Sequence, residues 1–76
     1  MSNKENVLTF GELLVGKSFN PSNDQRVDRL KELFAEAIDI LDTIPVSEKH
    51  VDSFVESTIN DIVKAQMSAV KCIFIK

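Results

Sequence analysis

The longest regular pattern in the sequence is an apolar repeat that begins at residue 27 and ends at residue 44. Apolar side chains recur there at steps of three and four residues, at Val27, Leu30, Phe34, Ala37, Leu41 and Ile44. This spacing places them along one side of an α-helix and is typical of the seam between two packed helices. The pattern predicts a helix over about residues 23–44, which Pro45 ends because the residue before a proline is pushed out of the helical region.

A second long helix is predicted over about residues 48–74, with Ser47 as its N-cap. It carries two apolar stripes, of which the first comprises Val51, Val55, Thr58, Ile62, Ala65, Ala69 and Ile73. The other stripe comprises Ile59, Val63, Gln66, Val70 and Phe74. One partner helix cannot cover both stripes, so we expect copies of the chain to associate through this helix. The small residues Ala65, Ser68 and Ala69 would let another helix approach closely.

A short helix is predicted over residues 10–15, ahead of the two long ones. Thr9 and Glu12 have the spacing of a capping box, and Gly16 is a natural left-handed C-cap. So short a helix is unstable alone and must dock onto a larger element. The predicted fold is therefore all-α, a short N-terminal helix plus an antiparallel hairpin of two long helices.

The segment 16–22 joins the short helix to the first long one and carries the first candidate site. Asn20-Pro21 favours a turn, and Ser22 with Gln25 has the spacing of a second capping box. The free N–H groups of a helix start suit an anion, and Phe19 beside them offers a flat apolar face. The segment is therefore a candidate seat for a phosphate attached to a base. The alternative is that Phe19 is an ordinary core residue.

The size of the chain supports one domain, residues 1–76. A monomer of this size buries only about 60% of the surface that its unfolded chain exposes, which leaves it marginally stable. One cysteine and one histidine provide neither a disulfide nor a metal site, so we expect oligomerisation to supply the missing stability. Apolar runs are much shorter than the roughly 18 residues of a membrane span, and we expect a cytosolic protein.

The charge is distributed unevenly. Residues 17–31 carry +2, residues 32–61 carry −7 and residues 62–76 carry +3, within a total of −3. In an antiparallel hairpin this gathers a basic pole near Phe19 and an acidic pole around the turn. The overall negative charge argues against DNA binding but allows a small anionic ligand. Alternatively, Lys71 only compensates a helix dipole, and Lys31, one step beyond the seam, is either plain surface or reaches a neighbouring subunit.

Catalytic chemistry has little support in the sequence. Glu32, Glu36 and Asp39 are spaced as a solvated helix face, and His50 has no nucleophile to serve. Cys72 lies in an apolar context and is predicted to be a small buried hydrophobe. Neither glycine belongs to a phosphate-binding fingerprint. We expect a protein that is not an enzyme and needs no cofactor or metal.

Several motifs occur together in one order. They are Thr9-Phe10-Gly11-Glu12, Val15-Gly16, Phe19-Asn20-Pro21-Ser22, Val27-Asp28-x-Leu30-Lys31, Ala35-Glu36-x-Ile38-Asp39 and Ala65-Gln66-Met67-x-Ala69-Val70-Lys71. With these motifs the chain resembles the small phage anti-CBASS sponge proteins. The resemblance implies a compact helical hexamer in the cytoplasm of the infected bacterium. It would sequester cyclic dinucleotides such as cyclic GMP-AMP, and cyclic trinucleotides at separate sites, before they activate a defence effector.

The resemblance also implies binding residues. For the cyclic dinucleotide, Phe19 would stack on a base and Lys31 would meet phosphate, with Asn20, Pro21, Ser22 and Arg26 around them. For the cyclic trinucleotide the candidates are Gln66, Ser68 and Lys71. The sequence departs from relatives that have tyrosine at the position of Phe19 and a bulky aromatic at that of Ser68. The rival interpretation is a small helical adaptor or inhibitor that binds a host protein through its exposed stripe.

Overall fold

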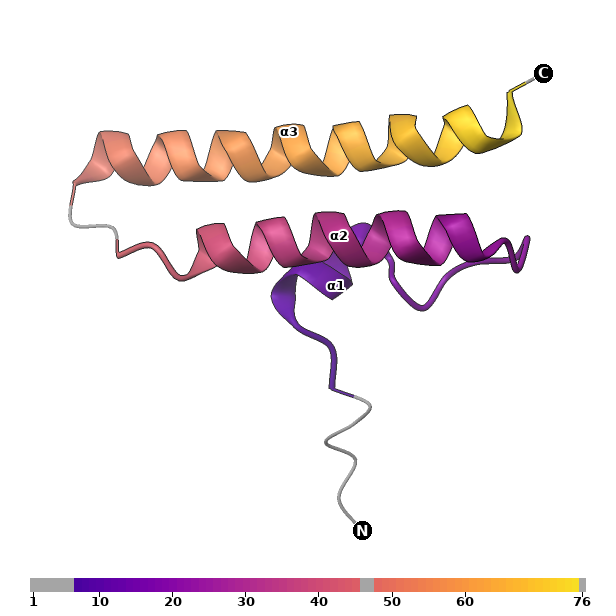
Figure 1. Cartoon of the computed structure of the whole chain (residues 1–76). Coiled ribbons are helices and arrows are strands. Elements are labelled where there is room, and N and C mark those ends of the chain that lie inside the picture. Colours follow the sequence, from indigo (N-terminus) through magenta and orange to yellow (C-terminus); the bar gives the residue numbers. More distant parts are fainter. Residues whose placement is uncertain (1–6, 46–47, 76) are drawn as a thin grey trace, which may run out of the picture.

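A computed structural model describes residues 7–45 and 48–75 and contains three helices (Figure 1). They are α1 (Phe10–Val15), α2 (Gln25–Asp42) and α3 (Lys49–Phe74). The described residues form no strand, which confirms the all-α prediction. None of the helices in these two segments is long and apolar enough to cross a membrane.

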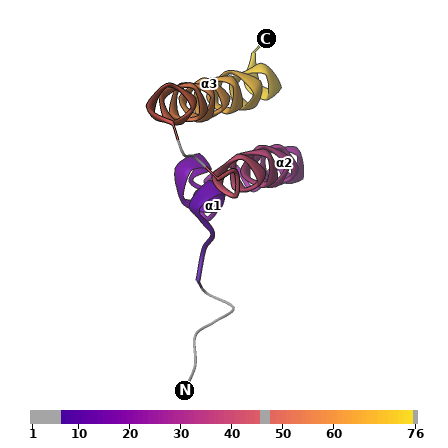
Figure 2. The same cartoon turned by 90° about the vertical axis from the view of Figure 1, so that its left-hand side faces the viewer.

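The two long helices form the predicted antiparallel hairpin, and α1 lies against α2 (Figure 1). In the end-on view of Figure 2, α1 and α2 lie side by side on the same side of α3. The radius of gyration is 14.1 Å. A compact chain of this length would have one of about 11 Å, so the fold is more open than a globular domain and has little interior.

The core sits where the three helices meet. Its buried members are Val15 from α1, Ala35 and Ile38 from α2, and Ile59 from α3. Half-buried side chains pack around them, namely Phe34, Leu41, Val55, Ile62 and Val63. With so few buried side chains, the hydrophobic stabilisation of one copy is small.

The buried face of α2 differs from the predicted seam. Of the seam residues in this helix, only Val27 is buried, and Ile44 lies beyond the end of the helix and is exposed. The other buried positions are Lys31, Ala35 and Ile38. The difference arises because α1 packs on α2 beside α3, so the buried face turns toward α1.

Helix α1 has the predicted bounds and caps. Thr9 Oγ1 accepts a hydrogen bond from Glu12 N at 3.1 Å, and Glu12 Oε1 accepts one from Thr9 N at 2.9 Å. Gly16 ends the helix with a φ of 63°, in the left-handed region that glycine adopts without strain. The capping box and the glycine C-cap are confirmed.

Helix α1 docks onto α2 by close contact at Gly11. A Cβ atom at this position would lie 2.2 Å from the carbonyl oxygen of Ala35, so only glycine allows the approach. The Gly11 N–H donates to Asp39 Oδ1 at 2.7 Å. The prediction that Asp39 belongs to a solvated helix face is therefore wrong. Asp39 holds the start of α1, where its negative charge also opposes the helix dipole.

The ends of the long helices differ from the prediction in detail. Helix α2 begins two residues later than predicted. It is capped by Asp24, whose side chain accepts a hydrogen bond from Arg26 N, so the prediction of a capping box formed by Ser22 and Gln25 is wrong. Glu48 precedes α3 and makes no side-chain capping bond. The predicted cap Ser47 lies outside the described residues.

Large apolar side chains remain exposed on all three helices and on the loop after α1. The most exposed within the helices are Leu13, Ile40, Phe54 and Met67. Cys72 is also exposed, so its prediction as a buried hydrophobe is wrong for a single copy. Exposed apolar surface of this extent is typical of a surface that takes part in an interaction.

Candidate functional site

A pocket of about 190 Å³ lies where the loop after α1 and the start of α2 meet the end of α3. Five of the six residues predicted to bind a cyclic dinucleotide line it, namely Phe19, Asn20, Pro21, Ser22 and Lys31. The remaining lining residues are Val27, Val70 and Phe74. Of the predicted set, Arg26 alone does not line the pocket.

Phe19 is 69% exposed. In a single copy it is therefore not a core residue, and its ring is open to a flat ligand. The Lys31 ammonium lies 5.6 Å from the centre of the ring, within the range of a cation–π contact.

Lys31 is buried, so the expectation that it is plain surface is wrong. Its ammonium donates to the carbonyl oxygen of Gly16 at 2.9 Å and to that of Phe19. A positive charge at the carbonyl that ends α1 is favourable, because it opposes the negative end of the helix dipole. Two of the three N–H donors of the ammonium are engaged, and the third makes no hydrogen bond to the residues that the structure describes.

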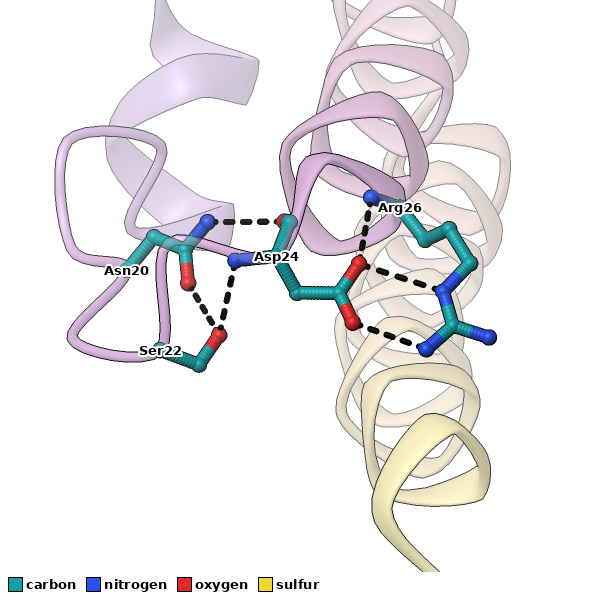
Figure 3. Close-up of polar contacts among 4 residues, drawn as sticks. All are labelled: Asn20, Ser22, Asp24 and Arg26. Carbon is teal, nitrogen blue, oxygen red and sulfur yellow. Dashed lines mark hydrogen bonds and ion pairs between the residues drawn. The ribbon is translucent and has the colours of Figure 1, made fainter.

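The loop before α2 is held rigid by its own side chains (Figure 3). Ser22 Oγ donates to Asn20 Oδ1 at 2.7 Å and accepts from Asp24 N at 3.1 Å. The Asn20 amide nitrogen donates to the carbonyl oxygen of Asp24 at 3.0 Å. The second Asn20 N–H donates to Asp28 Oδ1 at 2.9 Å. The predicted ligand residues Asn20 and Ser22 thus shape the pocket wall, and the hydrogen-bonding capacity that their side chains retain is as acceptors only.

Arg26 is paired with Asp24 instead of pointing into the pocket (Figure 3). Its Nε and Nη2 atoms donate to the two carboxylate oxygens at 3.1 and 2.8 Å. The side-chain hydrogen bond from Arg26 holds the pKa of Asp24 below its usual value, and the same bond raises the pKa of Arg26. The Asp24 carboxylate thus caps the start of α2 and occupies the position that we predicted for an anionic ligand.

The other cations near the pocket also have acidic neighbours. Lys17 lies 3.8 Å from Glu12, and Arg29 is paired with Glu32. These two cations and Arg26 are therefore paired within one copy, whereas Lys64 and Lys71 of α3 form no ion pair among residues 7–45 and 48–75. Lys31, whose acceptors are uncharged carbonyl groups, contributes the positive charge at the pocket.

The three residues predicted for a cyclic trinucleotide do not come together in one copy. Gln66 is buried and lines a groove of about 480 Å³ between α1 and α3. Ser68 and Lys71 are exposed and do not line that groove. A shared site for these residues would need a second copy.

The sequence alone did not identify Val27, Val70 and Phe74 as pocket residues. Val70 and Phe74 belong to the second apolar stripe, and the end of α3 must lie beside the start of α2 in an antiparallel hairpin. The apolar stripe and the hairpin geometry together could have identified Val70 and Phe74 as pocket residues. No group of three or more potential metal ligands occurs within the described segments.

Comparison with known protein families, curated proteins and solved structures finds no match to this chain. Several residues that carry the resemblance have a role in this fold. Gly11 and Asp39 dock α1, Gly16 ends it, and the Lys31 ammonium binds the carbonyl oxygen of Gly16.

Proposed function

We propose that this protein binds cyclic oligonucleotides such as cyclic GMP-AMP and sequesters them without hydrolysis. The observation that carries the proposal is the pocket that Phe19 and Lys31 line together with the segment 20–22. An exposed ring offers a stacking face for a base, and an ammonium with an unused donor offers a charge-assisted bond to a phosphate. Stacking and phosphate contacts together suit a nucleotide better than a purely apolar ligand.

The volume of the pocket bears on the assembly. Pockets that enclose a drug-sized ligand measure about 300–1,000 Å³, whereas this one measures about 190 Å³. One copy therefore encloses only part of a cyclic dinucleotide, although Phe19 and Lys31 also line the adjoining open groove of about 480 Å³. We propose that a neighbouring copy encloses the rest, within a homo-oligomer of six chains.

A sponge needs tight burial of its ligand and no catalytic group, so no residue is assigned to catalysis. The biological role that follows is phage anti-CBASS activity in the cytoplasm of an infected bacterium, where the ligand is withheld from its effector. A cyclic trinucleotide would bind across copies through Gln66, Ser68 and Lys71, which a single copy keeps apart.

Isothermal titration calorimetry with cyclic GMP-AMP, a cyclic trinucleotide and the linear dinucleotide tests the proposal. We expect heat of binding with the cyclic ligands, weaker binding of the linear one, and recovery of intact ligand after the protein is denatured. Recovery of hydrolysed ligand would show that the protein is an enzyme. No binding of any cyclic oligonucleotide would reject the sponge.

The second candidate is an adaptor or inhibitor that binds a host protein. The observation that favours it is the exposed apolar surface of α3, where Phe54 is 73% and Met67 60% exposed. Such residues are common anchors of helix-mediated interfaces. If the calorimetry shows no nucleotide binding, this candidate stands.

A further inference from the structure

A second pocket, of about 180 Å³, lies at the end of the hairpin where α2 leads to α3 (Figure 1). It shares no lining residue with the pocket of Phe19 or with the groove between α1 and α3. Its apolar lining comes from all three helices and from the chain after α2, namely Phe10, Leu41, Ile44, Val55 and Ile59. Ile59 is a buried member of the core, so the pocket extends down to the core.

Three carboxylates border the same pocket. Asp42 is the last residue of α2, and Asp52 and Glu56 lie one turn apart on α3. All three residues are exposed, and none forms an ion pair with the residues that the structure describes. The lining residues within 7–45 and 48–75 include no cation. This acidic pocket therefore combines an apolar floor with a negative rim that has no counter-charge.

The size and the charge of the acidic pocket indicate what it can bind. It is smaller than pockets that enclose a whole drug-sized ligand, but it can take one anchoring side chain of a larger partner. Arginine suits both of its parts, because the methylene stem lies on apolar surface while the planar guanidinium pairs with carboxylates. Asp52 and Glu56 are neighbours on one helix face, so one guanidinium can reach both.

The charge around the acidic pocket favours a partner with more than one cation. Residues 32–61 carry a net charge of −7, and they include every lining residue of this pocket except Phe10. A negative field of this extent attracts a segment with several positive charges and raises its rate of association. The partner that fits is therefore a basic segment of a protein, with apolar side chains beside its arginine.

We propose that the acidic pocket docks a basic segment of another protein, whose arginine lies on the apolar floor and pairs with Asp52 and Glu56. The inference adds a binding surface to the proposed function and does not depend on nucleotide binding. This surface includes neither of the exposed residues Phe54 and Met67.

A second copy of the chain is a poor occupant for this pocket. The sequence contains two arginines, Arg26 and Arg29, and each is paired with a carboxylate of its own copy. Exchanging one exposed ion pair for another gains little free energy. The other cations of the chain are lysines, whose compact ammonium cannot bind a carboxylate through two parallel hydrogen bonds.

The first test is a titration of the full-length protein with short capped peptides, followed by the amide signals of its NMR spectrum. We expect Leu-Arg-Leu-Arg to shift the signals around Val55 and Ile59 and to bind about tenfold more tightly than Leu-Glu-Leu-Glu. Gly-Arg-Gly-Arg lacks the apolar side chains, and Leu-Lys-Leu-Lys lacks the guanidinium, so both should bind severalfold more weakly than Leu-Arg-Leu-Arg. Absence of shifts at Val55 and Ile59, or equal binding of all three basic peptides, overturns the proposal.

The second test separates this pocket from the general negative charge. Asp52→Asn and Glu56→Gln should each weaken binding of Leu-Arg-Leu-Arg about two- to fivefold, and the double variant about tenfold. Asp61→Asn is the matched control, since it removes the same charge from an exposed position of α3 outside the pocket. It should leave the affinity nearly unchanged. Equal losses in Asp52→Asn and Asp61→Asn would show that only net charge attracts the peptide, and the proposal would be wrong.

The mass of the protein without peptide distinguishes a foreign partner from a second copy. Sedimentation equilibrium should give the double variant of Asp52 and Glu56 the same mass as the original protein. A lower mass would show that a second copy covers the acidic pocket, and would overturn the proposal.

Failure of this proposal can be distinguished from failure of the nucleotide proposal, because the acidic pocket and the pocket of Phe19 have no residue in common. A protein that binds Leu-Arg-Leu-Arg at the acidic pocket but no cyclic oligonucleotide rejects the sponge and keeps this surface. A protein that binds cyclic GMP-AMP but not the arginine peptide rejects this surface and keeps the sponge.

Discussion

At the scale of single residues, Lys31 has two roles that are difficult to separate. It is buried beneath the end of α1, where the carbonyl groups of Gly16 and Phe19 accept its hydrogen bonds, and it also lines the pocket. Phe19 has the opposite character, because its exposed ring contributes little to the fold. Variants at the two positions should therefore differ in which property they change.

Phe19→Ala should weaken the binding of cyclic GMP-AMP about ten- to a hundredfold, which corresponds to the loss of one stacked base. Its stability should change by less than about 0.5 kcal/mol, because the ring is 69% exposed. Phe54→Ala, at an equally exposed phenylalanine outside the pocket, should leave binding unchanged. Calorimetry and urea unfolding measure the two properties, and unaltered affinity in Phe19→Ala would place the ligand elsewhere.

Lys31→Met should lower the free energy of unfolding by about 3 kcal/mol. The change removes two charge-assisted hydrogen bonds and leaves two carbonyl groups without their donor. Lys64→Met, an exposed lysine of α3, should cost less than about 0.5 kcal/mol. If urea unfolding gives both variants the same stability as the original chain, the ammonium does not support α1.

At the scale of elements, α2 holds α1 at both of its ends. Asp39 binds the N–H of Gly11 near the start of α1, and Lys31, eight residues earlier on α2, binds the carbonyl of Gly16 at its end. Ala35 lies midway between them and is small enough for Gly11 to pack against its main chain. The charges at both ends oppose the dipole of α1, so one stripe of α2 specifies where this short helix docks and in which direction.

Gly11→Ala should undock α1, because the added methyl group would meet the Ala35 carbonyl oxygen at 2.2 Å. We expect a loss of stability of about 2 kcal/mol or more and rapid amide hydrogen exchange throughout α1. Thr9→Ala is the matched control, since it removes the cap of the same helix at a cost of about 1 kcal/mol but leaves the packing intact. Slow exchange of α1 in Gly11→Ala would mean that the contact can relax without undocking.

At the scale of the whole molecule, the chain has a small core and much exposed apolar surface. The buried hydrophobic residues are Val15, Val27, Ala35, Ile38 and Ile59. Burying the exposed faces of all three helices requires further partners, and identical copies are always present at equal concentration. Stability and assembly should therefore be linked.

The midpoint of thermal unfolding should rise by several degrees when the protein concentration is raised a hundredfold. The reason is mass action, because assembly stabilises the folded chain by an amount that depends on its concentration. Circular dichroism at two concentrations measures the shift. A midpoint independent of concentration, together with an 8.5 kDa particle, would show that a single copy is stable alone.

The sequence by itself determined the three helices, the capping box and the glycine end of α1, because these depend on residues within one or two helical turns. It also gave the antiparallel hairpin, since a short connection leaves two long amphipathic helices no other packing. The tertiary structure decided what depends on the docking of α1. That contact turned the buried face of α2, moved Lys31 and Asp39 from the surface to the ends of α1, and brought Phe19 and Lys31 beside Val70 and Phe74. Spacing along the chain cannot reveal such contacts, because they depend on which of several apolar faces meet in space.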